Sequence, residues 1–285
     1  MLFLTQRPKG AKKQSREEAK LACLNSSSDS KFRLYFAASR LCVNPSEMAF
    51  QKVKKDLRRA YELMRSHFGH RHWWPGETPF EVCIGAILTQ NTAWTNVERA
   101  MANLKAARVL EPERLFALPE SKLAQLIRPA GYFNVKARRL RSFLCVLVEE
   151  FGGDLRRMFV GKTSVVRKRL LAIHGVGPET ADSMLLYVGG HHSFVIDAYT
   201  KRIFQRHRWS RRTGEERRKT EAGNSRASDY DELKSLCEAA LNQKAGAARL
   251  DYWQDYHAQL VMVGKHFCRK RAPRCEQCPL KSLLP

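Results

Sequence analysis

The sequence has 285 residues, 44% of them hydrophobic, and it carries 51 Lys and Arg against 28 Asp and Glu, a formal net charge of +23. This length suits one large domain or two small ones, and the positive excess favours a polyanionic partner, because neutralising phosphates releases counterions. No apolar run approaches the roughly 18 residues of a membrane-spanning helix, and no long amphipathic basic helix stands apart, so a membrane protein is not expected.

Residues 1–47 are basic, rich in serine and weakly patterned, so we expect a disordered or loosely helical arm. The apolar stretch that opens the sequence is too short for the hydrophobic region of a signal peptide, and it precedes the charges. Eight cysteines would suggest disulfides in a secreted chain, but five of them are scattered. A reduced, cytoplasmic protein is therefore expected.

The first clear helical pattern begins at Met48, and from residue 78 onward the pattern is helical almost throughout. Thr78, Pro79 and Glu81 form a capping box with proline at the first helical position, which predicts a helix start. Alternating β-branched runs and Asn-Gly hairpins are absent from the sequence, so an all-α fold is predicted. Further helices are expected at 93–107, 121–127, 133–151, 163–172, 178–188, 198–207, 230–241 and 250–267.

The polar segment 206–229 interrupts this pattern, because it lacks an apolar face that could join a core. Its first part, residues 206–219, carries seven Lys and Arg against two Glu. A solvated insertion is the favoured interpretation, and an additional contact to phosphates is the alternative.

The stretch from residue 166 to residue 188 predicts a helix, a tight turn and a second helix. Gly175 and Gly177 would permit positive φ and close approach of the backbone, Pro178 suits the first turn of a helix, and Ala181 lets the two helices pack closely. Such a turn presents backbone N–H groups at a helix N-terminus, which is a site for phosphate. In a strongly basic chain, the pattern favours DNA binding over an ordinary corner between helices.

The chain resembles a known family at several of these positions. The motifs are ILTQNT at 87–92, GYFNVKA at 131–137, IHGVGPETAD at 173–182, VIDAYTKR at 195–202 and the final cysteines. Together they resemble the helix-hairpin-helix DNA glycosylases of the endonuclease III superfamily, over roughly residues 50–285. Within that superfamily, the chain is most similar to the 3-methyladenine DNA glycosylase branch, which shares ILTQNT and GYFNxKA.

The resemblance implies a catalytic aspartate shortly after the hairpin. It falls on Asp197, and Arg202 follows it as an implied DNA-binding residue. Breaking an N-glycosidic bond develops positive charge on the sugar, and a carboxylate beside the sugar stabilises this state and can orient a water. Asp197 is also well placed to cap the helix that follows it, and both roles can hold at once.

Glu179 stands where the bifunctional members of the family carry a lysine. That lysine attacks the sugar and forms a Schiff base, which a carboxylate cannot do. The resemblance therefore implies a monofunctional enzyme that uses water. Two interpretations of the carboxylate itself stay open, namely a pocket residue that faces the flipped base and a residue that suits the helix dipole.

The resemblance also implies residues that hold DNA after base extrusion, which costs a few kcal/mol. Gln90 matches the position that fills the vacated stack, and Lys136 belongs to a second turn that binds the DNA backbone. Trp73 and Trp74 offer aromatic faces that stack on bases and attract a cationic alkylated purine. The alternative for the two tryptophans is core packing, which we expect of at least one of them.

Cys268, Cys275 and Cys278 resemble the iron–sulfur loop of endonuclease III in their spacing. The family has a fourth cysteine six residues after the third, and Leu284 occupies that position here. Since four thiolates normally hold a [4Fe–4S] cluster, this departure leaves the cofactor open.

Three interpretations of the cysteine loop remain. A cluster could bind with one open iron, or with Cys237 or an exogenous ligand as the fourth donor. Zinc could bind with His266 as its fourth ligand, although structural zinc sites usually show two close pairs. The third interpretation is a loop without metal. We favour the cluster, with the role of fixing a basic loop against phosphates.

The expected architecture is all-α and two-lobed. A six-helix barrel spans 80–197 and includes the helix-hairpin-helix at 163–188, and the second helical lobe combines 48–79 with 198–285. DNA is expected in the cleft between the lobes, with Asp197 at its mouth.

The predicted function is that of a monofunctional DNA glycosylase in base excision repair. It would act as a monomer on double-stranded DNA with a damaged base and remove alkylated purines. Three rivals remain: a bifunctional glycosylase and lyase that uses another amine, such as Lys201 or the N-terminus, a non-catalytic DNA-binding module, and an RNA-binding helical protein.

Overall fold

The computed structural model describes residues 45–72, 76–209 and 225–285, and within these ranges the chain forms helices and no strand. The all-α class is therefore confirmed. No helix in these ranges is both long and apolar enough to cross a membrane. The elements in chain order are α3 (Pro45–Phe68), α4 (Pro79–Leu88), α5 (Trp94–Ala106), α6 (Pro112–Ala117), α7 (Glu120–Leu126), η2 (Arg128–Ala130), α8 (Phe133–Cys145), the π-helical turn η3 (Val146–Glu150), α9 (Leu155–Phe159), α10 (Thr163–Leu171), α11 (Pro178–Tyr187), α12 (Ala198–Arg206), α14 (Ser225–Ala240), α15 (Gly246–His266), η4 (Cys275–Gln277) and η5 (Lys281–Leu283).

Two regions singled out in the sequence fall wholly or largely outside these ranges. They are the basic arm, of which residues 1–44 are not described, and the polar segment 206–229, of which residues 210–224 are not described. The expectations for both regions therefore stay predictions.

Helix α4 begins as its capping box predicts. The Thr78 hydroxyl accepts a hydrogen bond from the backbone N–H of Glu81 at 3.2 Å, and Pro79 occupies the first helical position. The Glu81 carboxylate accepts its return bond from the N–H of Glu77 and not from that of Thr78. The cap fixes the start of a helix that is buried along its length, because every residue from Phe80 to Leu88 is buried.

Most predicted helices agree with the observed ones to within a few residues, but three differences have local causes. Helices α6 and α9 are not predicted, because six and five residues are too short to establish a helical period. The predicted run 133–151 ends as an α-helix at Cys145 and continues as the π-helical turn η3.

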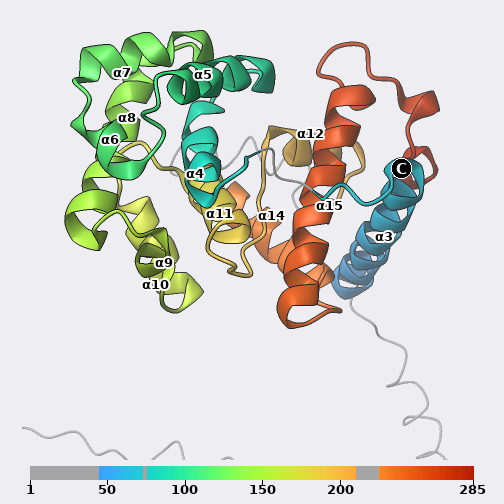
Figure 1. Ribbon diagram of the computed structural model, residues 1–285. Coiled ribbons are helices and arrows are strands. Elements are labelled where there is room, and N and C mark those ends of the chain that lie inside the picture. Colours follow the sequence, from blue (N-terminus) through green and yellow to red (C-terminus); the bar gives the residue numbers. More distant parts are fainter. Residues whose placement is uncertain (1–44, 73–75, 210–224) are drawn as a thin grey trace, which may run out of the picture. The chain divides into compact units, whose positions relative to one another are not determined.

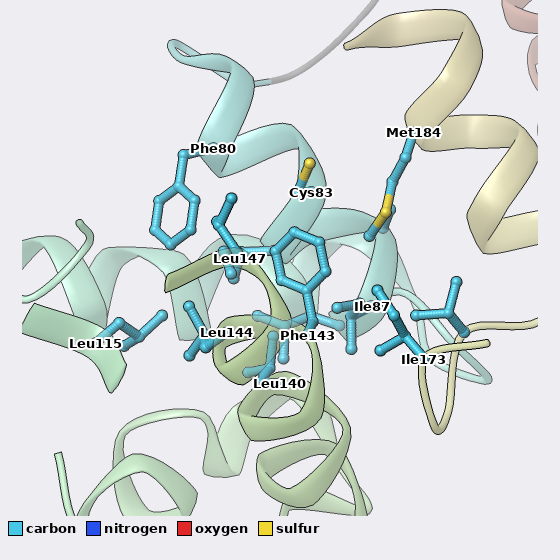
Figure 2. Close-up of a cluster of buried hydrophobic side chains, with 14 of the residues drawn as sticks. Phe80, Cys83, Ile87, Leu115, Leu140, Phe143, Leu144, Leu147, Ile173 and Met184 are labelled. Carbon is cyan, nitrogen blue, oxygen red and sulfur yellow. The ribbon is translucent and has the colours of Figure 1, made fainter. Parts of the chain in front are cut away.

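The first core contains buried side chains from residues 80–185. Figure 2 shows its centre, where Phe80, Cys83 and Ile87 of α4 and Leu140 and Phe143 of α8 belong to one buried cluster. The same cluster receives the hairpin helices through residues such as Leu170 of α10 and Met184 of α11. Apolar contacts with the first core therefore hold the hairpin in place.

The second core contains buried side chains from residues 57–64 and 186–280. Helix α11 contributes to both cores, with Leu185 in the first and Leu186 in the second. Figure 1 shows α11 and α4 between the helices α5 to α10 and the helices α12 and α15. The division into a barrel at 80–197 and a second lobe stays a prediction, although the two cores divide the chain near these boundaries.

Helices α12 and α15 approach closely at Gly264. A Cβ at Gly264 would overlap the ring of Tyr199, so glycine is required at this crossing. Tyr199 is the second residue of α12, whose N-cap is Asp197. The position of α12 therefore depends on the absence of a side chain on α15.

Asp255 of α15 anchors that helix to the segment that contains α3. Its buried carboxylate accepts hydrogen bonds from the hydroxyl of Tyr61 and from the backbone N–H of Arg71, each at 2.8 Å. Bonds to an ionised acceptor are among the stronger ones in proteins. This network holds α15 in place for the side chains that it presents on its other face.

Candidate active site

The turn between α10 and α11 uses its two glycines differently. Gly175 has a φ of +87°, and a Cβ there would overlap the side chain of Arg139. Gly177 is the N-cap of α11 with a φ of −90°, so the expectation of positive φ at this residue is wrong. Apart from its two neighbours in the chain, no described residue lies within 4 Å of the position of a Gly177 Cβ. Gly175 is thus needed by the fold, whereas Gly177 leaves the helix N-terminus open to approach.

A cavity of about 750 Å³ opens beside this turn. Five of the residues selected from the sequence line it, together with side chains of α12 and α15. These five are Gln90, Gly175, Gly177, Glu179 and Asp197.

Asp197 has two contacts that use different carboxylate oxygens. Its Oδ1 accepts a hydrogen bond from the backbone N–H of Thr200 at 2.7 Å, which caps α12. Its Oδ2 lies 3.8 Å from Nε2 of His257, and both residues line the cavity. The helix cap therefore fixes the carboxyl group while its second oxygen remains at the cavity wall.

Glu179 lies in the first turn of α11 and also lines the cavity. Desolvation by the surrounding protein raises the pKa of its carboxyl group to about 7, the nearby charge of Asp197 adds to the rise, and the charge of Lys201 opposes it. The carboxyl group thus changes its charge near neutral pH, which is unusual for glutamate.

Gln90 is held against the hairpin. Its amide Nε2 donates to the carbonyl of Gly175 at 3.1 Å and to the hydroxyl of Thr180 at 2.9 Å, while its Oε1 accepts from Arg139. The side chain forms part of the cavity wall, so entry into a DNA stack would require these bonds to break.

The side chain of Lys136 is buried within the protein, and the expectation that its turn binds the DNA backbone stays a prediction. It is 1% exposed, and its ammonium group donates to the carbonyls of Leu88 and Ala130 at 2.8 and 2.7 Å. Burial lowers its pKa to about 8. Lys136 joins the end of α4 to the turn before α8, and so supports the loop that contains Gln90.

Arg202 is not among the residues that line the cavity, and its expected contact with DNA stays a prediction. It donates to the carbonyl of Cys268 at 2.6 Å and to that of Gly264 at 3.2 Å. It therefore connects α12 to the end of α15. Trp73 and Trp74 lie outside the described residues.

Two residues that the sequence analysis does not select are candidates as well, namely His257, which lines the cavity, and Tyr132, an exposed residue of the turn before α8. His257 gives no signal in the sequence, because a single histidine in an amphipathic helix is most often a core residue. Tyr132 is 72% exposed and adopts a left-handed φ of 46°, and its place directly after Gly131 in an expected turn could have indicated it. A large side chain held outward at a strained position is a candidate contact surface.

Cys268, Cys275 and Cys278 line one small cavity, and Leu284 lies at its wall. Arg206 donates to the Cys268 sulfur at 3.0 Å. Leu284 offers no ligand, so these residues do not fit a four-thiolate cluster.

The other donors considered for this loop are not among the residues that line that cavity. His266 packs near the rings of Phe68 and Phe267, and Cys237 is buried in the second core. Over the part of the chain that the structure describes, no group of three His, Cys, Asp or Glu side chains is arranged to hold a metal ion.

Comparisons with known proteins agree with this geometry. Residues 84–227 match the model of the HhH-GPD superfamily of base excision DNA repair proteins. The chain is 44% identical over 222 residues to the protein of Methanocaldococcus jannaschii named "Putative DNA repair glycosylase MJ1434", covering 78% of this chain and 92% of that protein.

Two solved structures have a similar fold. The 3-methyladenine DNA glycosylase of H. pylori bound to 1,N6-ethenoadenine matches with a TM-score of 0.58 and 25% identity, over 76% of this chain and 97% of that one. A non-covalent complex of endonuclease III with DNA matches with a TM-score of 0.60 and 20% identity, over 81% and 94%.

Proposed function

The chain belongs to the HhH-GPD superfamily of base excision DNA repair proteins and is a DNA glycosylase, and from this premise we propose that it is a monofunctional enzyme that removes alkylated purines from double-stranded DNA. The observation that carries the proposal is the pair of carboxyl groups, Glu179 and Asp197, that line one cavity beside the hairpin. The hairpin helix thus presents a carboxyl group where a lyase of this superfamily would present an amine.

Asp197 would stabilise the positive charge that develops on the sugar as the glycosidic bond breaks. A purine alkylated at N3 or N7 is itself cationic, so it departs as a neutral base and needs no proton from the enzyme. The bond's electron pair goes to the base, and water attacks C1′ of the sugar. This chemistry needs a fixed carboxylate and a water, and the cap from Thr200 holds that carboxylate in place.

A cationic base also suits the electrostatics of the cavity. Glu179 loses its proton near neutral pH, and its carboxylate would attract the positive ring that it faces. The similarity to the 3-methyladenine DNA glycosylase of H. pylori supports this substrate class.

The duplex would be held at the open N-terminus of α11. Gly177 leaves space in front of the backbone N–H groups there, and a helix N-terminus favours an anion. The exposed ring of Tyr132 is a further candidate contact to DNA. The cysteine loop would act structurally, since it receives Arg202 and Arg206 of α12.

A bifunctional enzyme is the second candidate, because two lysines lie at or near the cavity. Lys265 of α15 lines it, and Lys201 lies close enough to Glu179 to lower its pKa. Either amine would have to replace the hairpin lysine of the lyases.

The test is a panel of duplexes, each with one defined lesion, incubated with the enzyme and analysed with and without alkali. We expect release of methylated purines and strand breaks only after alkali. Breaks without alkali would contradict the monofunctional proposal, and release of oxidised pyrimidines alone would contradict the substrate class.

A further inference from the structure

Arg139 of α8 is a half-buried cation on the wall of the cavity. Its one hydrogen bond to a described residue runs from Nη1 to Oε1 of Gln90, which is a neutral acceptor. The ion pairs formed among the described residues do not include Arg139. A cation that is partly removed from water without an opposite charge is unfavourable, so the described contacts do not account for an arginine at this position.

The remaining N–H groups of Arg139 are accessible. A guanidinium group carries five N–H donors, and the bond to Gln90 uses one of them. Neither Nε nor Nη2 donates to a described residue, and neither is among the buried polar atoms that lack a partner. Both nitrogens therefore reach solvent, so a ligand can accept hydrogen bonds from them without displacing Gln90.

The hairpin turn holds the side chain of Arg139 in place. A Cβ at Gly175 would lie 2.2 Å from Cγ of Arg139 and 2.8 Å from its Cδ, so the aliphatic stem lies directly against the backbone of the turn. Gln90 fixes the other end, because its amide also donates to the carbonyl of Gly175 and to the hydroxyl of Thr180. The guanidinium group is thus preorganised and loses little conformational freedom when it binds a ligand.

Lys136, one helical turn earlier on α8, adds a second positive charge. Burial is the main cause of its lowered pKa, and the charge of Arg139 contributes to the same effect, so the two cations are neighbours. The ammonium group of Lys136 donates to two backbone carbonyls, neither of which carries a charge. This side of the cavity is therefore electropositive, which favours an anion.

The two carboxyl groups belong to another part of the cavity wall. The charges that act on the pKa of Glu179 are those of Asp197 and Lys201, and the charge of Arg139 is not one of them. The damaged base would lie with these carboxyl groups, so the part of the nucleotide that suits Arg139 is the negatively charged one. In DNA this part is the phosphate, whose oxygens match the planar array of N–H groups on arginine.

We propose that Arg139 is a phosphate-binding residue that holds a backbone phosphate next to the nucleotide whose base enters the cavity, an inference that rests on the proposed function. Nε and Nη2 donate to the phosphate oxygens, while Nη1 keeps its bond to Gln90. The bound phosphate neutralises the guanidinium group, so the charge of Arg139 no longer opposes the entry of a cationic purine.

The test measures binding to a duplex that contains a tetrahydrofuran analogue of an abasic site, which has no base to release. Arg139→Met keeps the aliphatic stem over Gly175 and removes the charge. Loss of one phosphate contact should reduce the slope of log affinity against log salt by about 0.9 and weaken binding about five- to tenfold at about 0.1 M salt. Arg59→Gln is the matched control, because it removes one positive charge from an exposed pair with Glu62 on α3, and it should keep the wild-type slope.

A second readout separates a phosphate contact from support of Gln90. A neutral methylphosphonate replaces one phosphate at a time, at each position near the analogue on the strand that contains it. At one position, this replacement should weaken binding by the wild type about as much as Arg139→Met does, and the two changes together should weaken binding no further. If Arg139 only supports Gln90, the two losses should be additive at every position.

A wild-type salt slope in Arg139→Met would overturn the proposal. Additive losses at every methylphosphonate position would also overturn it and assign Arg139 to the support of Gln90. If Arg139→Met does not fold, Arg139→Gln carries both measurements with the same expected results. Failure of the proposed function would appear separately, because the panel of lesions measures base release by the wild type, whereas this binding test uses a duplex that has no base at the site.

Discussion

Arg167 of α10 and Asp182 of α11 form a two-point ion pair across the hairpin, with nitrogen–oxygen distances of 2.9 and 3.1 Å. Asp182 is fully buried and also accepts a hydrogen bond from Ser193 at 2.6 Å. Arg167 reaches on to Asp231 of α14 at 2.9 Å. The pair therefore connects both helices of the hairpin to a helix of the second core.

Removing Arg167 should destabilise the protein more than its partial exposure suggests. Arg167→Met leaves the Asp182 carboxylate buried, with Ser193, the Tyr230 side chain and the more distant Lys234 beside it but without its bidentate partner. We expect a loss of about 2–4 kcal/mol in the free energy of unfolding, measured by urea denaturation. Arg156→Met, at a solvent-exposed pair, should give no measurable change, and equal small effects from both variants would contradict the prediction.

Asp197→Asn should abolish base release and preserve the fold. Asparagine caps helices as well as aspartate does, so α12 should stay in place while the negative charge is lost. We expect a fall in the single-turnover rate of about 10³-fold or more, with little change in DNA affinity. Asp154→Asn is the matched control, because Asp154 caps α9 through Arg156. Near wild-type base release by Asp197→Asn would restrict Asp197 to its capping role.

Gly177→Val should weaken binding to every duplex about equally. The backbone at Gly177 accepts a side chain without strain, and the space in front of it is open, so the added methyl groups would lie where a phosphate approaches. We expect about a tenfold loss of affinity and a shallower dependence on salt. Binding titrations at several salt concentrations measure both, and thermal melting checks the fold. Unchanged affinity with an intact fold would exclude phosphate binding at this turn.

Glu179→Lys should create covalent trapping that the wild type lacks. Borohydride traps an imine, and an imine requires an amine at the sugar. We expect no protein–DNA adduct from the wild type with its preferred lesion, and a detectable adduct from the variant even if base release slows. Gel electrophoresis after reduction measures both, with Lys265→Ala as the control for the other amine at the cavity. Efficient trapping by the wild type that disappears in Lys265→Ala would establish a lyase.

Glu179→Gln should change the pH profiles of activity and stability in opposite senses. The folded-state pKa of about 7 exceeds the ordinary value of 4.5, so the folded protein binds more protons than the unfolded chain between these two values, and stability falls as pH rises through that window. An uncharged amide at this position removes the loss. The melting temperature of Glu179→Gln should therefore exceed that of the wild type at about pH 8 and approach it at about pH 5.

The pH dependence of base release by the same variant follows from the loss of the negative charge of Glu179. Release of a cationic methylated purine by the wild type should increase from about pH 6 to about pH 8 as Glu179 ionises, and the increase should be absent in Glu179→Gln. Single-turnover rates across that range test this. An identical rise in both proteins would show that another group titrates.

The sequence predicts those structural features that depend on contacts between residues a few positions apart. Thr78 and Asp197 are recognisable as helix caps because a cap bonds to a residue three positions away. Lys136 and Arg202 point to DNA in the sequence because they are charged residues in family motifs, but their partners include Leu88 and Cys268, 48 and 66 positions away. Such contacts depend on how helices pack, and no pattern near either residue indicates them.

The same reason explains why the sequence does not reveal His257. Its environment is defined by Asp197 and Tyr187, and the latter lies 70 positions earlier in the chain. By contrast, Glu179 can be selected from the sequence because its turn has a recognisable pattern. Its raised pKa could not be anticipated, since desolvation depends on the complete wall of the cavity.

The contact between Gly264 and Tyr199 has a consequence for how sequence variants of this enzyme would be interpreted. Gly264 lies within a helix, makes no proposed contact with DNA and would be classed by position as a routine packing site. Any side chain there pushes against the residue two places after Asp197. Inherited or selected substitutions at Gly264 would then behave like damage to the active centre, and a variant classifier that weighs only proximity to DNA would score them as benign.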